Sequence, residues 1–194
     1  MCIRDRYCDD KSNQKRKSCR STLKIIFNFL TAWLAPILCF TTEEAWLSDN
    51  FNHKDSIHLR MFPKTDNKWG NKNFGNKWKE IINVRKVVTS AIEIEREKKI
   101  IGSSLEAAAE LTVLKKIKDS LNDINLNDLF IVSSAKIVDK LPGKAFSLDG
   151  IKHTTVNIKK ANGSKCERCW VLSKEVVINK NNLCNRCQNV TKSE

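Results

Sequence analysis

The chain has 194 residues, with 35 Lys and Arg against 22 Asp and Glu, which gives a formal net charge of +13 at pH 7. This length allows one domain or two small ones with a sizeable helical core. The positive excess points to a polyanionic partner, either nucleic acid or an anionic membrane surface, and nucleic acid is favoured over the alternative of a solvated basic surface without a partner. The longest apolar run, about residues 30–40, is shorter than the roughly 20 residues that cross a bilayer. We therefore expect this run in the core and expect no membrane association.

The N-terminal part predicts two helices. The first twenty residues are polar and basic, and apolar residues then recur every three or four positions to about residue 38, which indicates a helix capped by Ser21 or Thr22. Pro36 is expected to kink or end it. A capping box from Thr41 to Glu44 predicts a second helix to about residue 47. Trp33 and Trp46 are expected to anchor the core.

The middle of the chain predicts a long helix and a small α+β block. We expect mostly loop over residues 48–74 and a helix over about 76–99, with Gly102 as its C-terminal cap. Strands are predicted over 107–114, 129–138 and 154–160, and short helices over 115–122 and 125–128. The predicted domains are a helical bundle over 1–105, a small α+β region over 106–160 and a terminal module over 161–194.

The terminal module carries the most specific motif of the chain. Cys166 and Cys169 form one C-x-x-C pair, and Cys184 and Cys187 form another. Two such pairs can supply the tetrahedral set of four sulfurs that zinc prefers, with no position left for a catalytic water. The spacing therefore predicts one structural zinc ion in a four-cysteine zinc ribbon.

Two other interpretations of the cysteines are weaker. A pair of disulfides is disfavoured, because nothing in the chain resembles a secretory leader and a reducing compartment keeps thiols free. A thioredoxin-like redox site needs one C-x-x-C in a βαβ setting, which two pairs do not match. We therefore expect a cytoplasmic protein in which Cys2, Cys8, Cys19 and Cys39 are free thiols.

Three segments together resemble bacterial isoleucyl-tRNA synthetases. Residues 30–46 resemble the Leu-x-Pro-x-x-x-Phe-x-x-Glu-Glu-x-Trp segment of that family's anticodon-binding bundle, and residues 78–107 resemble the helix and turn that follow it. Residues 165–170 and 183–187 are similar to its terminal zinc ribbon, and Cys-Glu-Arg-Cys-Trp narrows the resemblance to the isoleucine enzymes. The resemblance runs from about Tyr7 onward, while residues 1–6 fit only loosely.

The resemblance implies a mainly α fold, the anticodon-binding helical bundle of a class I synthetase, followed by the small α+β segment and the zinc ribbon. The His-x-Gly-His and Lys-Met-Ser-Lys-Ser signatures of the catalytic Rossmann domain do not occur in the sequence, and the editing domain is also absent. ATP use and isoleucine activation are therefore expected only in a catalytic part several hundred residues upstream. The chain by itself is expected to be an inactive, monomeric fragment.

The resemblance also implies a partner and candidate contacts. The partner is the anticodon arm of isoleucine tRNA, and the family's base-reading Arg and Trp correspond here to Arg168 and Trp170. An indole offers a stacking platform for a base, and a guanidinium can stack or hydrogen-bond. Candidate phosphate contacts are Lys165, Arg186, Lys15, Arg16, Lys17 and Arg20. For Arg85 and Arg96 an ion pair with a nearby Glu is expected instead.

Two other classes of function are alternatives. One is a DNA-binding or repair protein, because formamidopyrimidine-type glycosylases end in a similar ribbon. The Trp-rich segment around Pro36 has no place in that class. The other is a structural appendage that orders the parent enzyme without touching RNA.

Overall fold

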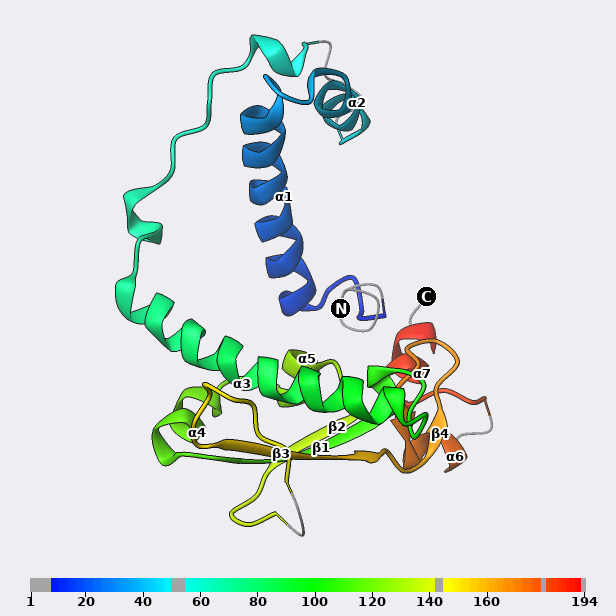
Figure 1. Ribbon diagram of the computed structural model, residues 1–194. Coiled ribbons are helices and arrows are strands. Elements are labelled where there is room, and N and C mark those ends of the chain that lie inside the picture. The colour runs from blue at the N-terminus through cyan, green and yellow to red at the C-terminus, as the bar shows by residue number, and fades with distance from the viewer. Residues whose placement is uncertain (1–7, 50–54, 142–144, 179–180, 193–194) are drawn as a thin grey trace. The chain divides into compact units, whose positions relative to one another are not determined.

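The computed structural model describes residues 8–49, 55–141, 145–178 and 181–192. The chain forms two compact units, one made of residues 10–70 and the other of residues 1–9 and 71–194. Figure 1 shows the elements of both units.

The unit of residues 10–70 is built on two helices. Helix α1 spans Gln14–Leu34 and α2 spans Cys39–Asp49, and two short 3-10 helices follow, η2 (Ile57–Leu59) and η3 (Asn67–Trp69). Helix α1 begins earlier than predicted, because the side chain of Asn13 rather than Ser21 or Thr22 accepts from the first backbone N–H groups. Lys15, Arg16, Lys17 and Arg20 therefore lie within this helix. The helix ends before Pro36, as predicted.

The core of this unit is small. Trp46 packs with Ala35, Ile57 and Phe27, and its Nε1 donates to the Asp55 carbonyl oxygen at 3.2 Å. Trp46 is therefore the predicted core anchor, whereas Trp33 is 49% exposed and is not. The prediction that the apolar run is core is likewise wrong for most of it, since Ile37 and Phe40 are 75% and 91% exposed. Helix α2 starts before Thr41, so the predicted capping box does not form.

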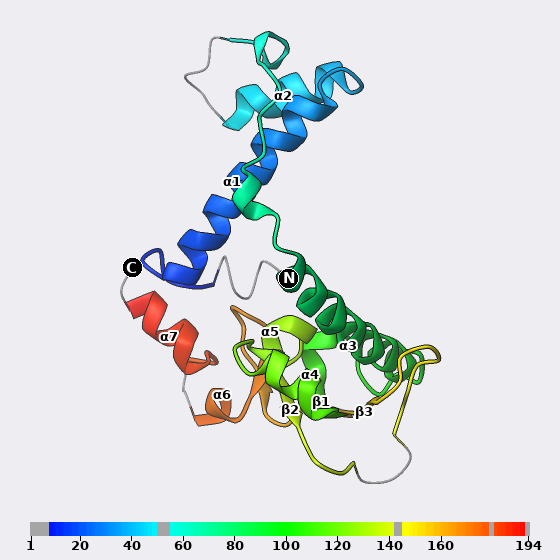
Figure 2. The same cartoon turned by 90° about the vertical axis from the view of Figure 1, so that its left-hand side faces the viewer.

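The second unit is a helix on a three-stranded sheet. Helix α3 (Lys72–Glu97) is followed by η4 (Ser104–Glu106), β1 (Ala107–Val113), α4 (Lys115–Leu121), α5 (Leu126–Phe130), β2 (Ser134–Ile137) and β3 (Thr154–Lys160). The strand order is β2-β1-β3, with β1 parallel to β2 and antiparallel to β3. Helix α3 lies along one face of this sheet in both views (Figures 1 and 2).

Period-two alternation fixes the register of the sheet. Ala107, Ala109 and Leu111 of β1 are buried and face the core, where they meet Val156 and Ile158 of β3. Helix α3 adds a stripe at helical spacing to the same core: Ile81, Val84, Val87, Val88, Ala91 and Ile92. The long helix therefore packs with the α+β block.

Two local predictions in this unit are wrong. Lys99 at φ 59°, not Gly102, adopts the left-handed conformation after α3, and Gly102 instead donates its N–H to the Glu106 carboxylate at 3.0 Å. The predicted strand over 129–138 shrinks to Ser134–Ile137, because Leu129 and Phe130 belong to α5 and Ile131 turns left-handed at φ 58°. Phe130 enters the core from a helix, although its apolar neighbours suggested a strand.

The terminal module completes this unit. It consists of the hairpin β4 (Ser164–Lys165) and β5 (Leu172–Ser173), then α6 (Lys174–Ile178) and α7 (Asn185–Lys192). The fold class, mainly α with a small α+β segment and a cysteine-rich ribbon, is thus confirmed, and the domain limits at 105 and 160 stay predictions. Among the described helices, none is both long and apolar enough to cross a membrane.

Candidate metal centre and nucleic-acid interface

The two C-x-x-C pairs meet in space. The Sγ atoms of Cys166, Cys169, Cys184 and Cys187 all lie within 4.8 Å of one another, and all four residues are buried. The Sγ atoms of Cys169 and Cys184 are 3.7 Å apart. Sulfurs that surround a metal tetrahedrally at about 2.3 Å are about 3.8 Å from each other, so the cluster has the size of a zinc site.

Local backbone geometry makes each pair converge. The β4–β5 hairpin carries the first knuckle, where the N–H of Trp170 donates to the Cys166 carbonyl oxygen at 2.8 Å and Trp170 itself is left-handed at φ 64°. Cys184 directly precedes α7 and Cys187 lies in its first turn. The N–H of Cys184 also points at the Cys166 sulfur, at 3.4 Å. Such N–H donors orient and stabilise a thiolate.

The electrostatics of the cluster suit a bound cation. Burial disfavours the thiolate of Cys166, but backbone N–H groups of Cys169, Cys184 and Arg168 outweigh it and lower its pKa to about 7. Burial and the neighbouring Cys169 charge raise the pKa of Cys187. Four thiolates cannot share so small a buried site unless a positive ion neutralises them, and four soft sulfur donors suit zinc. The residues present therefore fit the group that the spacing predicts.

Trp170 lies on the surface next to the buried cysteine cluster. Its side chain is 46% exposed, and the Nζ of Lys165 lies 5.7 Å from the centroid of its ring. The ring is therefore accessible, with a cation next to it. An accessible aromatic face beside a positive charge can accept a stacked base and its phosphate.

The two arginines of the knuckles make contacts that the sequence did not predict. Nη1 of Arg168 donates to the carbonyl oxygen of Cys8 at 2.6 Å, and Nη1 of Arg186 lies 3.3 Å from Oδ1 of Asp9. The first contact joins residues 160 positions apart, so no local pattern could have indicated it. Both arginines, predicted to contact RNA, are engaged within the chain.

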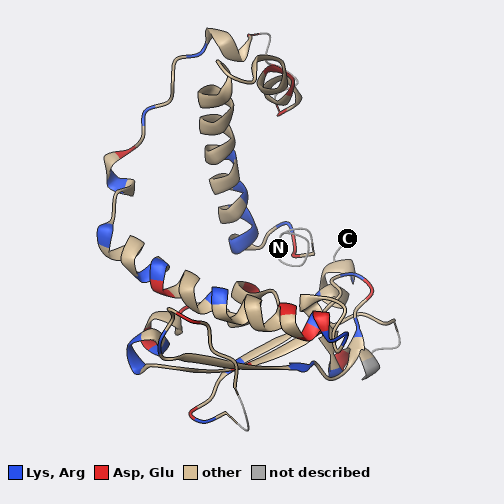
Figure 3. Cartoon of the chain, viewed as in Figure 1, with Lys and Arg blue, Asp and Glu red and all other residues tan. Residues whose placement is uncertain are grey.

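The remaining predicted contacts lie on α1. Lys15, Arg16, Lys17 and Arg20 all fall in its N-terminal half, where Figure 3 shows Lys and Arg gathered along the helix. Arg96 pairs with Glu93 through 2.9 and 3.0 Å contacts, as predicted. These four residues thus place a cluster of positive charge on one segment of α1.

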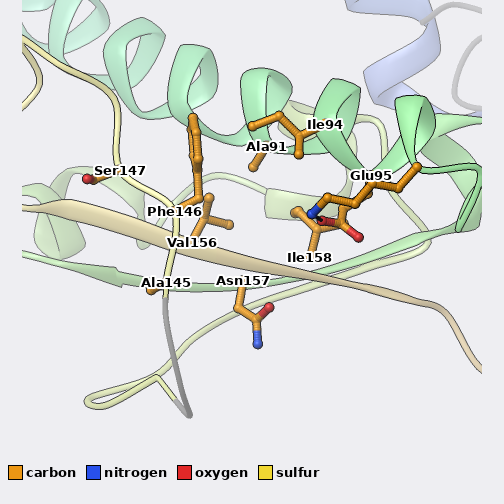
Figure 4. Close-up of a pocket in the computed structure, with 10 residues that line it drawn as sticks. Ala91, Ile94, Glu95, Ala145, Phe146, Ser147, Val156, Asn157 and Ile158 are labelled. Atoms are coloured by element: carbon orange, nitrogen blue, oxygen red, sulfur yellow. Dashed lines mark hydrogen bonds and ion pairs between the residues drawn. The ribbon is translucent and has the colours of Figure 1, made fainter.

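A separate hollow lies between α3 and β3. It measures about 300 Å³, and Ala91 and Ile94 face Phe146 and Val156 across it (Figure 4). The charged residues of its lining, Glu95 and Lys98, pair with each other at 2.7 Å. The lining is otherwise mostly apolar and brings together no set of catalytic groups.

Comparison with known proteins agrees with both parts of the chain. Residues 1–115 match the model of the anticodon-binding domain of tRNA ligases, and residues 163–190 match a zinc finger found in FPG and IleRS proteins. The chain therefore belongs to the family of tRNA-ligase anticodon-binding domains, and the match outside the ribbon disfavours the repair-protein alternative.

Curated relatives make the resemblance more specific. Isoleucine–tRNA ligases of Bartonella henselae and Agrobacterium fabrum are 38% and 40% identical to it over 172 residues. The one from Brucella abortus strain 2308 is 41% identical over the same length. Each alignment covers 88% of this chain and 18% of the relative, so the chain spans about a fifth of their length. The predicted resemblance to isoleucyl-tRNA synthetases is confirmed.

Proposed function

We propose that this chain is the part of an isoleucine–tRNA ligase that binds the anticodon arm of isoleucine tRNA. The whole ligase would join isoleucine to that tRNA with ATP in the cytoplasm, and the chain itself would supply binding without chemistry. The observation that carries the proposal is an exposed Trp170 fixed next to a closed centre of four cysteines, in a chain whose first 115 residues match an anticodon-binding domain.

The proposed role of zinc is structural. Cys166, Cys169, Cys184 and Cys187 would hold one Zn²⁺, which when bound would contribute folding free energy on the order of 10 kcal/mol. All four donors come from the protein, so the ion would offer no open position for a substrate. The knuckle that the ion closes carries Trp170, whose backbone N–H already bonds to Cys166.

The proposed RNA contacts divide into two groups. Trp170 would stack on a base, with Lys165 near the adjoining phosphate. Helix α1 would contact RNA phosphates through Lys15, Arg16, Lys17 and Arg20. Such contacts position the RNA and do not read its bases. Arg168 and Arg186 are candidate RNA contacts only because of the family resemblance. In the structure Arg168 contacts residue 8 and Arg186 contacts residue 9.

The proposed protein partner is the rest of the ligase. Leu23, Ile26, Leu30, Ile37 and Phe40 of the unit formed by residues 10–70 are at least 46% exposed. Leu23, Ile26 and Leu30 line one hollow, and exposed apolar surface that is gathered in this way marks interaction sites. The relatives are several times longer than this chain, and their additional polypeptide would cover these side chains.

The test is binding of the zinc-loaded chain to an isoleucine tRNA anticodon stem-loop. Trp170→Ala should weaken binding by about 1–3 kcal/mol, the usual value of one base stacked on an aromatic ring. Trp69→Ala is the matched control, because Trp69 is also exposed, at 56%, and is not part of the ribbon of residues 161–194. Equal competition by duplex DNA, or unchanged affinity of Trp170→Ala with zinc retained, would contradict the proposal.

A further inference from the structure

The two knuckles share a feature beyond their cysteines. Each has an arginine directly before its second cysteine, Arg168 before Cys169 and Arg186 before Cys187. These equivalent arginines reach two consecutive residues from the other end of the chain. Arg168 binds the backbone of Cys8 and Arg186 binds the side chain of Asp9.

The contact with Cys8 is reciprocal. Nη1 of Arg168 donates to the Cys8 carbonyl oxygen at 2.6 Å, and Sγ of Cys8 donates to the Arg168 carbonyl oxygen at 3.5 Å. Cys8 is only 4% exposed and packs in the same buried cluster as the four cysteines of the metal centre. Burial raises the pKa of its thiol, which keeps the S–H available as a donor. A charged donor on a shielded carbonyl is one of the stronger kinds of hydrogen bond.

The contact with Asp9 is also shielded. The carboxylate side chain of Asp9 is 12% exposed and the guanidinium side chain of Arg186 is 35% exposed. Charges that are partly withdrawn from water interact more strongly than an exposed pair and are screened less by salt. Asp9 is followed at once by Asp10 and the turn to Asn13, whose side chain caps α1. The ribbon thus contacts the chain a few residues before α1 begins.

We infer that Arg168 and Arg186 are positioning residues that hold Cys8 and Asp9 against the four-cysteine centre. We call this pair of contacts the clamp. It ties the N-terminal segment, residues 8–13, which leads into α1, to the zinc ribbon. Each arginine can reach residue 8 or 9 only while its own knuckle holds its backbone in place. Loss of the metal therefore releases the N-terminal segment as well as the ribbon. The inference rests on the proposed zinc site and is independent of RNA binding.

Hydrogen exchange of the zinc-loaded full chain, measured by mass spectrometry without RNA, tests this clamp. Arg168→Ala and Arg186→Ala should each speed exchange of the amides of residues 8–13 by about tenfold or more, with one zinc retained per chain. Removal of zinc by a chelator should have the same effect on these amides. Arg85→Ala on α3 removes the same charge from an exposed site and should leave them unchanged.

If the arginine variants lose zinc, faster exchange could come from zinc loss alone, so two further variants are needed to test the contacts. Asp9→Asn breaks the ion pair from outside the ribbon and should also speed exchange of residues 8–13, whereas Arg186→Lys keeps the charge and should restore most of the protection. Wild-type exchange of residues 8–13 in Asp9→Asn and in the alanine variants would overturn the clamp. Because RNA is absent from the assay, failure of the stem-loop binding test would leave this result untouched, and the reverse is equally true.

Discussion

Gly163 offers a sharp test of how the ribbon is built. It has φ +112°, a region that L side chains rarely adopt, and a Cβ added there would lie 2.3 Å from the carbonyl carbon of Ser173 and 2.6 Å from the nitrogen of Lys174. Both are backbone atoms of the strand and helix that frame the first knuckle, so they cannot rotate away. Gly163→Ala must therefore distort the β4–β5 hairpin.

The expected loss of stability combines the strain at this φ and the short contacts of the added Cβ. Backbone strain of a non-glycine residue in such a region is about 1–3 kcal/mol, and the backbone contact adds to it. We expect a loss of about 3 kcal/mol in ribbon stability. Because metal binding and folding of a closed site are linked, the loss should appear as roughly 100-fold weaker zinc affinity in a chelator competition.

Gly75→Ala is the matched control for this substitution. Gly75 lies inside α3, and a Cβ there meets nothing within 4 Å. Alanine should therefore stabilise α3 by up to about 1 kcal/mol and leave zinc affinity unchanged. If Gly163→Ala binds zinc within roughly threefold of the wild type, the hairpin geometry does not hold the knuckle and the reasoning fails.

Three other changes probe the sheet unit and the RNA interface. Phe130→Ala removes a core side chain that is 2% exposed and should lower the free energy of unfolding in urea by about 3–5 kcal/mol, while a loss below about 1 kcal/mol would place Phe130 outside the core. The Glu110 carboxylate lies 2.9 and 3.0 Å from the Nζ atoms of Lys159 and Lys136, whose hydrogen bonds lower its pKa. Its folded pKa is below its unfolded one, so its stabilisation is present above about pH 4.5 and is lost as the pH falls through the lowered value. Glu110→Gln should thus cost about 1 kcal/mol at pH 7 and progressively less as the pH falls below about 4.5, and a cost that does not change with pH would contradict this. Affinity for the stem-loop should fall steeply with salt, with a log–log slope of about −0.7 for each neutralised phosphate, and salt-independent binding would remove the proposed phosphate contacts.

Local patterns in the sequence predicted much of this fold. The buried stripe of α3 and the alternation in β1 and β3 are periodic signals, and each gave the right element within a few residues. The two C-x-x-C pairs predicted a cluster because two residues between cysteines bring both sulfurs to one side. These features depend on neighbours along the chain.

The errors have two causes: local turns and caps that an apolar pattern does not reveal, and contacts between distant parts of the chain. Residues 129–133 are as apolar as a strand, yet Phe130 fills the core from α5 because Ile131 turns left-handed. The start of α1 was placed too late because a basic run gives no apolar stripe, although Asn13 is a good cap. The contacts of Arg168 and Arg186 with residues 8 and 9 span most of the sequence and carry no spacing that could predict them.

Metal analysis of the purified chain, combined with alkylation of its thiols, tests the central claim most directly. We expect one zinc ion per chain, with Cys166, Cys169, Cys184 and Cys187 protected until a chelator removes the metal. Purified protein without zinc, in which those four thiols react at once with the alkylating reagent, would contradict the account.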